Sequence, residues 1–394
     1  MPDRPVFEVY ATFTKLGLVA FGGPAAHLAL FRTVFTHERG WVSEARFDTL
    51  MALCQFLPGP GSSQTAAALG HERAGRLGAL AAMAGFATPS LILMGLAGWG
   101  VTVFAELIGS GVIGGLLAAA AAVVANAVLS MVRTQAASPA GAGIAAAAFA
   151  LVLSTSLAPV PLAVIQPVVI ALGALAGALA MRAPNNARSD SARKGVGQTI
   201  GWLAVFAVPL AGLPLLAGAG EAALLADTAY RAGALVFGGG HVVLPLLGAG
   251  AVPELIDQER FLAGYGLAQA IPGPLFTFAA FLGAAAAETP LQAAGYAALA
   301  GLSIFAPGLL LVYAALPVWD RLQSARGARA AIAGAAAAVT GVLGAALIDP
   351  VVLAVPREVA AYAILSGAFI ALRWGKFAPP LVIAASGAAG WLAL

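Results

Sequence analysis

The chain has 394 residues, of which 61% are hydrophobic and only 9% are charged, whereas a soluble globular chain carries about 25% charged residues. So little charge cannot coat a water-soluble surface, and this excludes a soluble enzyme, a disordered chain and a nucleic-acid-binding domain. A polytopic membrane protein remains, because a helix that crosses the hydrocarbon needs about 20 mostly apolar residues. The 48 glycines and 24 prolines permit close helix packing and interrupt helices where a site is lined by backbone.

The first predicted element in chain order is an interrupted apolar region over residues 8–72. It contains two breaks, FGGP at 21–24 and LPGPG at 57–61. These breaks predict broken helices or re-entrant hairpins, because proline and glycine stop a helix within the membrane. Four continuous apolar stretches that are long enough to span a membrane follow, at 77–99, 107–132, 138–157 and 160–182.

A hydrophilic segment, APNNARSDSARKGVG at 183–197, separates the two halves of the chain. One span at 198–217 follows it, and then a second interrupted region at 222–288, with FGGG at 237–240 and IPGP at 271–274. The remaining predicted spans are 290–317, 328–349, 351–372 and 377–394. The predicted organisation is an N-terminal repeat (1–182), a linker with a connecting transmembrane helix (183–221) and a C-terminal repeat (222–394).

The two interrupted regions match each other, which predicts an internal repeat. Phe21-Gly22-Gly23 recurs as Phe237-Gly238-Gly239, and Pro58-Gly59-Pro60 recurs as Pro272-Gly273-Pro274. The same alignment pairs polar residues of the two copies: Lys15 with Arg231, Arg46 with Arg260, and Gln55 with Gln269. If the two-residue gap in the alignment falls directly after the Gly pair, His27 also pairs with His241.

The basic residues of the loops predict opposite orientations for the two copies, because basic loops tend to stay cytoplasmic. Arg73 and Arg76 place the loop before residue 77 inside, and Arg373 and Lys376 mark an inside loop between the last two spans. Counting crossings from these loops places Glu288 outside. The loop at Glu288 is the repeat partner of the loop at Arg73, so two equivalent loops lie on opposite sides of the membrane. The repeats are therefore predicted to be inverted, with the N-terminus cytoplasmic and the C-terminus periplasmic.

The repeated breaks predict an anion site. Two broken helices that meet in mid-membrane direct unpaired N–H groups and positive helix ends into one cavity. The alternative is that the glycines only permit close helix packing. We favour the anion site, because the same breaks recur in both halves, each beside a basic residue.

Candidate site residues follow from this interpretation. Lys15 and Arg231 would neutralise a divalent oxyanion, unless each snorkels to the interface, and Gln55 and Gln269 would orient the ion, unless they only join helices. The predicted substrate-binding set is Lys15, Gly22, Gly23, Gln55, Pro58, Gly59, Pro60, Ser62, Ser63, Arg231, Gly238, Gly239, Gln269, Pro272, Gly273 and Pro274. Candidates for gating or proton coupling are His27, Glu44, Arg46, His241 and Arg260.

The two halves differ after their PGP turns. Ser62 and Ser63 follow the first turn, whereas Leu275 and Phe276 follow the second. The first half is therefore expected to make most of the contacts with the substrate. An intramembrane serine protease is disfavoured, because the serines do not recur. The four histidines and Cys54, without a carboxylate cluster, form no recognisable metal site, and the sequence has no nucleotide-binding loop. We therefore expect no cofactor.

The motifs resemble those of a known family. FGGP followed by RFDTLMALCQFLPGPG, with FGGG followed by RFLAGYGLAQAIPGP, resembles the chromate ion transporter family in its long, two-domain form, over nearly the whole chain. The resemblance implies an inner-membrane secondary transporter that expels chromate from the bacterial cytoplasm by means of the proton motive force, with sulfate as a close structural analogue. The second copy departs from the first at Gly240, which stands where the first has Pro24.

We therefore expect an all-α polytopic membrane protein of two inverted-topology repeats with broken or re-entrant helices, joined by one extra transmembrane helix. The expected function is export of chromate across the bacterial inner membrane by alternating access. The expected partners are a chromate-like or sulfate-like oxyanion, protons as the coupling ion and the lipid bilayer, with no nucleic acid, and a homodimer is left open. The alternatives are a sulfate or other oxyanion carrier and, from another class, a membrane-embedded enzyme.

Overall fold

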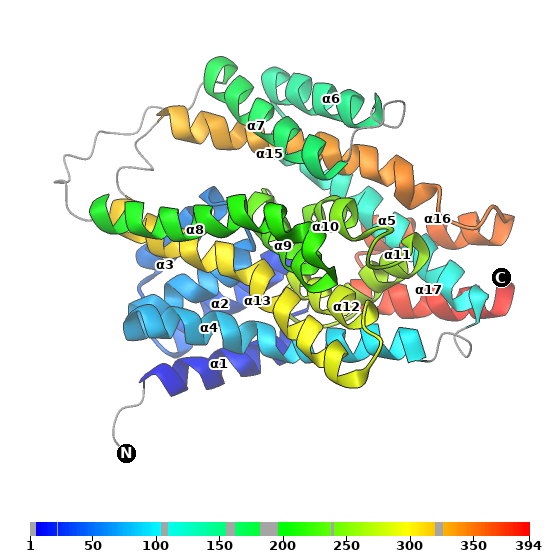
Figure 1. Ribbon diagram of the computed structural model, residues 1–394, viewed down its shortest axis with the longest axis horizontal. Coiled ribbons are helices and arrows are strands. Elements are labelled where there is room, and N and C mark those ends of the chain that lie inside the picture. The colour runs from blue at the N-terminus through cyan, green and yellow to red at the C-terminus, as the bar shows by residue number, and fades with distance from the viewer. Residues whose placement is uncertain are drawn as a thin grey trace.

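A computed structural model of the chain describes residues 5–21, 23–103, 109–154, 162–181, 196–237, 240–319 and 326–394. Within these ranges every regular element is a helix. Figure 1 shows that many of the long helices run along the longest axis of the molecule, with the start of α1 and the end of α17 toward opposite ends. The segments long and apolar enough to cross a membrane are Gly61–Val103, Ser110–Gln135, Val196–Ala219, Pro290–Val318 and Gly327–Val352. The prediction of an all-α polytopic membrane protein is confirmed.

The first half places its helix breaks at the two predicted motifs. α1 ends and α2 begins around FGGP, and α3 ends and α4 begins around LPGPG. α4 is itself two helices, because Ala74 and Gly75 have non-helical backbone angles. The elements of this half are α1 (Pro5–Val19), α2 (Gly23–Arg32), the π-helix η1 (Thr33–Glu38), α3 (Glu44–Phe56), α4 (Gly61–Val103), α5 (Ser110–Gln135), α6 (Pro139–Ser154) and α7 (Leu162–Ala180).

The second half repeats this order after the connecting helix α8 (Val196–Leu216). Its elements up to the long helix α13 are α9 (Glu221–Leu235), η4 (Gly240–Val242), α10 (Val243–Ala251), α11 (Gln258–Ala268), η5 (Leu275–Thr277), α12 (Phe278–Ala285) and α13 (Pro290–Ala315). The elements after it are η6 (Leu316–Val318), α15 (Arg326–Ala346), η7 (Leu347–Val352), α16 (Val359–Arg373) and α17 (Pro379–Ala393). The span predicted to start at 351 begins only at Val359, because the Pro350 and Pro356 region turns the chain first.

A glycine contact in the first half has a matching contact in the second half. α1 and α9 each have 15 residues. Gly17 of α1 lies so close to the carbonyl of Phe86 in α4 that a side chain would not fit, and Gly233 of α9 lies in the same way against the carbonyl of Ile304 in α13. The pairs α1 with α4 and α9 with α13 are therefore equivalent.

The two halves interleave through their later helices. α5 packs against α16 and α17 of the second half, and α15 packs against α6 and α7 of the first. Small residues allow the backbones to approach at both places: Gly111 meets Gly390 of α17, and Gly177 of α7 meets Gly334 of α15. Each half thus completes the packing of the other.

The connecting helix α8 packs on the outside of this arrangement. None of its residues is buried, and it is tied to the body by hydrogen bonds from the Thr199 hydroxyl to the Ala314 carbonyl (2.8 Å) and from the Tyr230 hydroxyl to the Phe206 carbonyl (2.9 Å). An apolar helix with this much exposed surface suits contact with lipid.

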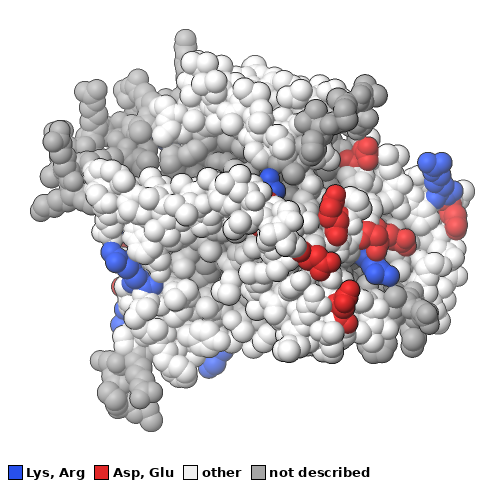
Figure 2. Space-filling model, viewed as in Figure 1, with Lys and Arg blue, Asp and Glu red and all other residues white. Residues whose placement is uncertain are grey.

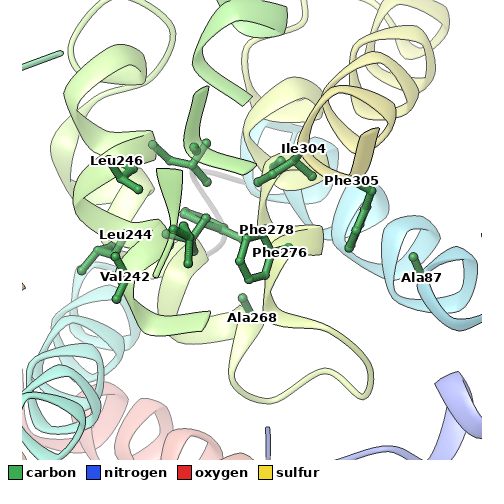
Figure 3. Close-up of a cluster of buried hydrophobic side chains, with 14 of the residues drawn as sticks. Ala87, Val242, Leu244, Leu246, Ala268, Phe276, Phe278, Ile304 and Phe305 are labelled. Atoms are coloured by element: carbon green, nitrogen blue, oxygen red, sulfur yellow. The ribbon is translucent and has the colours of Figure 1, made fainter. Parts of the chain in front are cut away.

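The second hairpin, α11 to α12, closes over an apolar cluster. Figure 3 shows Phe276 and Phe278 of this hairpin among side chains of α10 and α13, such as Leu244 and Ile304. The Phe278 ring also packs edge-on against Phe261 at 5.2 Å between centroids. The first hairpin buries polar side chains after its turn instead, from Ser62 to Thr65. The predicted difference between the halves is therefore present in the structure.

A wide part of one face of the molecule carries no charged side chains among the described residues. Figure 2 shows acidic side chains gathered over the region of α10 to α12 and a broad uncharged area on the rest of this face. Exposed acidic residues around α11 and α13 include Glu254, Asp257, Glu259 and Glu288. An uncharged belt between charged ends is what a bilayer requires of a spanning protein.

Candidate functional site

Reciprocal backbone hydrogen bonds join the two pairs of helix breaks. The N–H of Gly59 donates to the carbonyl of Val236 (2.7 Å), and the N–H of Gly273 donates to the carbonyl of Ala20 (2.8 Å). Val236 and Ala20 each come directly before a Phe-Gly-Gly motif, so each PGP turn holds the break of the other half. Gly59 and Gly273 have φ values of +117° and +102°, a backbone conformation that favours glycine.

A cavity of about 100 Å³ lies where these breaks meet. Three helical segments begin at its wall: α2 at Gly23, η4 with α10 at Gly240, and η5 with α12 at Leu275. The first N–H groups of a helix have no partner within the helix, and the helix dipole is positive at this end. The convergence of three N-terminal ends makes the cavity suited to an anion.

Polar side chains also line the cavity. Gln269 lies on the wall, and its Nε2 atom is buried without a hydrogen-bond partner among the described residues. His241 lies on the wall with its Nδ1 2.9 Å from the Tyr265 hydroxyl. A buried donor without an acceptor is costly, so a bound oxyanion would satisfy Gln269. Asn126 of α5 completes this set.

Asn126 and Tyr265 were missed by the sequence interpretation. Asn126 is the only amide side chain in the apolar stretch 107–132, which is a signal that could have identified it. Tyr265 carries no such signal, because a tyrosine in an apolar helix is also an ordinary core residue. Its contact with His241 depends on how α11 packs against η4.

His27 lies buried behind the first break. Its Nε2 is 3.1 Å from the Ala20 carbonyl, which also accepts the Gly273 N–H, and its Nδ1 is 3.3 Å from the Ser62 hydroxyl. The ring also meets Phe86 edge-on at 5.3 Å between centroids. His27 therefore connects the start of α4 to the carbonyl that receives the second PGP turn.

The two cations predicted to neutralise the substrate do not line this cavity. Lys15 is exposed on α1. Arg231 forms an ion pair with Asp227, one helical turn earlier on α9, and the Asp227 side chain is fully buried. Arg231 lines a small separate recess that includes Gln166. The substrate-binding role of Lys15 and Arg231 stays a prediction.

The repeat-related glutamines occupy different environments. Gln55 is exposed on α3, whereas Gln269 lines the cavity. Ser62 bonds His27, and the Ser63 hydroxyl is buried without a partner among the described residues. Gly23 and Gly273 line the cavity as well. The candidates Gly22, Gly238 and Gly239 lie outside the described residues.

The charged candidates for gating form exposed or half-exposed ion pairs. Glu44 pairs with Arg32 (2.6 Å), Arg46 with Glu72 (2.7 Å), and Arg260 with Asp257 (3.3 Å). Exposed pairs of this kind contribute little to stability. The first two pairs tie α3 to α2 and to α4, and so hold the first hairpin against its neighbours.

Sequence comparisons agree with the two-part architecture. The model of a family described as Chromate transporter matches residues 7–178 and 223–391. The chain belongs to the chromate transporter family. The two matched ranges leave out α8 and the hydrophilic segment before it. This family is a family of transporters.

Relatives in the chromate transporter family match over most of their length. The chain is 30% identical to the chromate transport protein of Pseudomonas aeruginosa, over 99% of this chain and 93% of that protein. It is 27% identical to a probable chromate transport protein of Synechococcus elongatus, over 88% of this chain and 85% of that protein. It is 25% identical to the chromate transport protein of Cupriavidus metallidurans, over 100% of this chain and 94% of that protein. No solved structure matches the chain.

Proposed function

We propose that the chain exports chromate, a tetrahedral divalent oxyanion, across the bacterial inner membrane, driven by the proton motive force. The cavity at the helix breaks carries the proposal, because three helix N-termini and the unpartnered Nε2 of Gln269 converge there. The substrate class is supported by the family and by relatives named for chromate transport.

Alternating access is supported by the way in which the repeats hold each other. Each PGP turn binds the break of the other half through one backbone hydrogen bond, from Gly59 or Gly273. In inverted-repeat transporters, one repeat rocks against the other around a site at their interface. We propose inverted repeats over 1–182 and 222–394, with the N-terminus cytoplasmic and the C-terminus periplasmic. The start of α1 and the end of α17 lie toward opposite ends of the molecule in Figure 1, which is consistent with this orientation.

Chromate flux in liposomes made from the purified protein and lipid alone tests this function. We expect flux that accelerates when a proton gradient is imposed and that falls when sulfate competes. Flux without any response to the gradient would contradict the proton coupling. Faster movement of sulfate than of chromate would favour the alternative, a carrier of sulfate or another oxyanion. If neither anion moved, the proposed transport function would be contradicted.

Replacing Gln269 by leucine is expected to weaken chromate binding. A hydrogen bond to a charged group contributes about 1.5–3 kcal/mol, so the half-saturating chromate concentration should rise by about 10-fold or more. The matched control is Gln198→Leu, because Gln198 is exposed on the outer helix α8. Initial flux rates over a range of chromate concentrations give the half-saturating concentration of each variant. The same half-saturating concentration in both variants would contradict the role of Gln269.

A further inference from the structure

The turn between α16 and α17 reaches the cavity of the helix breaks. Leu372, in the last turn of α16, and Pro379, the first residue of α17, both line that cavity. Arg373 directly follows Leu372, and Lys376 lies three residues before Pro379. The turn that joins these two lining residues therefore carries two cationic residues, although neither of them lines the cavity itself.

This turn lies beside the middle of a long helix. Val123 and Asn126 of α5 line the same cavity, while at the other end of the hairpin Gly390 packs against Gly111, near the start of α5. At 1.5 Å per residue, Asn126 is about 22 Å along α5 from Gly111. α17 thus runs from the beginning of α5 to its middle part.

The length of the hairpin agrees with this position. α16 and α17 have 15 residues each, or about 22 Å, which is shorter than the roughly 30 Å of hydrocarbon. Each helix alone is therefore shorter than the full crossings that the sequence predicted on the two sides of an inside loop. Figure 1 shows α16 and α17 together in the right-hand part of the molecule.

The charges of Arg373 and Lys376 are not balanced by an ion pair with any described carboxylate. In the part of the chain that the structure describes, neither Arg373 nor Lys376 has an ion pair or a hydrogen bond from its side chain. Arg373 is half-buried and Lys376 is exposed. A cation at membrane depth is costly unless it meets an anion, a partner or water. An anion in the adjacent cavity would balance this charge.

The cavity in turn lacks a charged side chain of its own. Its lining holds Gln269, Asn126 and His241 as polar groups and no Lys, Arg, Asp or Glu. Helix ends supply only partial charges, whereas a divalent oxyanion carries two full ones. The corresponding turn of the first half, 155–161, contains no Arg or Lys in its sequence, so only the second half carries basic residues at this turn.

We propose that Arg373 and Lys376 supply the positive charge that attracts and holds the divalent oxyanion in the cavity of the helix breaks, an inference that rests on the proposed function. The guanidinium of Arg373 can bind two oxygens of a tetrahedral anion at once, and the ammonium of Lys376 acts as a point charge. These residues take the role that the sequence assigned to Lys15 and Arg231.

The test is the half-saturating chromate concentration in liposomes containing Arg373→Gln, Lys376→Gln or both changes. Because charge-assisted hydrogen bonds are lost, each single change should raise this concentration about 10-fold and the double change should raise it further. Arg373→Lys and Lys376→Arg should stay much closer to the unchanged protein. The matched control is Arg357→Gln, an exposed arginine just before the other end of the same hairpin, and it should change little.

The outcomes separate this inference from the proposed function. If the unchanged protein moves no chromate, the proposed function fails. If the unchanged protein moves chromate and the double variant keeps its half-saturating concentration, the role of the turn is overturned. Dependence of the flux on anionic lipid, lost in the double variant without a change in that concentration, would assign the cations to a lipid headgroup and would also overturn it. Lys376→Gln alters an exposed side chain, so it decides the test if the double variant does not accumulate.

Discussion

Replacing Gly273 by alanine is expected to abolish chromate transport, with a fall of about 100-fold or more in initial flux. Gly273 has a φ of +102°, which alanine adopts only with strain, and an added Cβ would press on the Ser90 side chain. The turn would have to shift, and the shift would break the hydrogen bond from the Gly273 N–H to the Ala20 carbonyl. Since Gly273 also lines the cavity, the change disturbs both the site and the contact between the repeats.

Gly40→Ala is the control that separates strain from position. Gly40 also has a positive φ, +61°, but an added Cβ would have no neighbour within 4 Å. Both variants carry backbone strain of about 1–3 kcal/mol, so both should lose some stability, but only Gly273→Ala should lose transport. Flux per amount of folded protein in liposomes measures the difference. Equal flux in the two variants would contradict a special role for the second PGP turn.

The sequence predicted the course of the chain well because its signals are local. Each apolar stretch identified a helix, and the glycines and prolines of FGGP and LPGPG mark the points where helices end and begin again. The pairing of the breaks at Phe21 and Phe237 is also a property of the sequence. Its structural counterpart is the equivalent packing of Gly17 and Gly233 against carbonyls of α4 and α13.

The composition of the site depended on packing that no local signal contains. Gln55 and Gln269 hold the same position in the repeat, but one is exposed and the other lines the cavity. Hydrophobic periodicity shows that a helix is buried but not which helix covers it. The packing of α5 against α16 and α17 brings Asn126 to the cavity, together with the turn that carries Arg373. Counting basic loops predicts an inside loop at that turn, and this orientation stays a prediction.

Replacing Arg231 by methionine is expected to destabilise the protein strongly. The change would leave the carboxylate of Asp227, which is fully buried, without its ion pair, and the loss of one partner of a buried pair costs about 3–5 kcal/mol. We expect a lower thermal transition of the purified protein and less protein in the membrane. Arg260→Met is the comparison, because its partner Asp257 is half exposed, and an exposed pair contributes little.

The double variant Asp227→Asn/Arg231→Met distinguishes a structural pair from a substrate contact. Neutralising both partners removes the unpaired buried charge, so most of the lost stability should return. We also expect this double variant to transport chromate, because Arg231 lines a recess with Gln166 and not the cavity of the helix breaks. A stable double variant that moves no chromate would instead support the prediction from the sequence that Arg231 binds the anion. If the double variant transports chromate with an unchanged half-saturating concentration, Arg231 does not bind the anion. That result would support the proposal that Arg373 and Lys376 supply the positive charge.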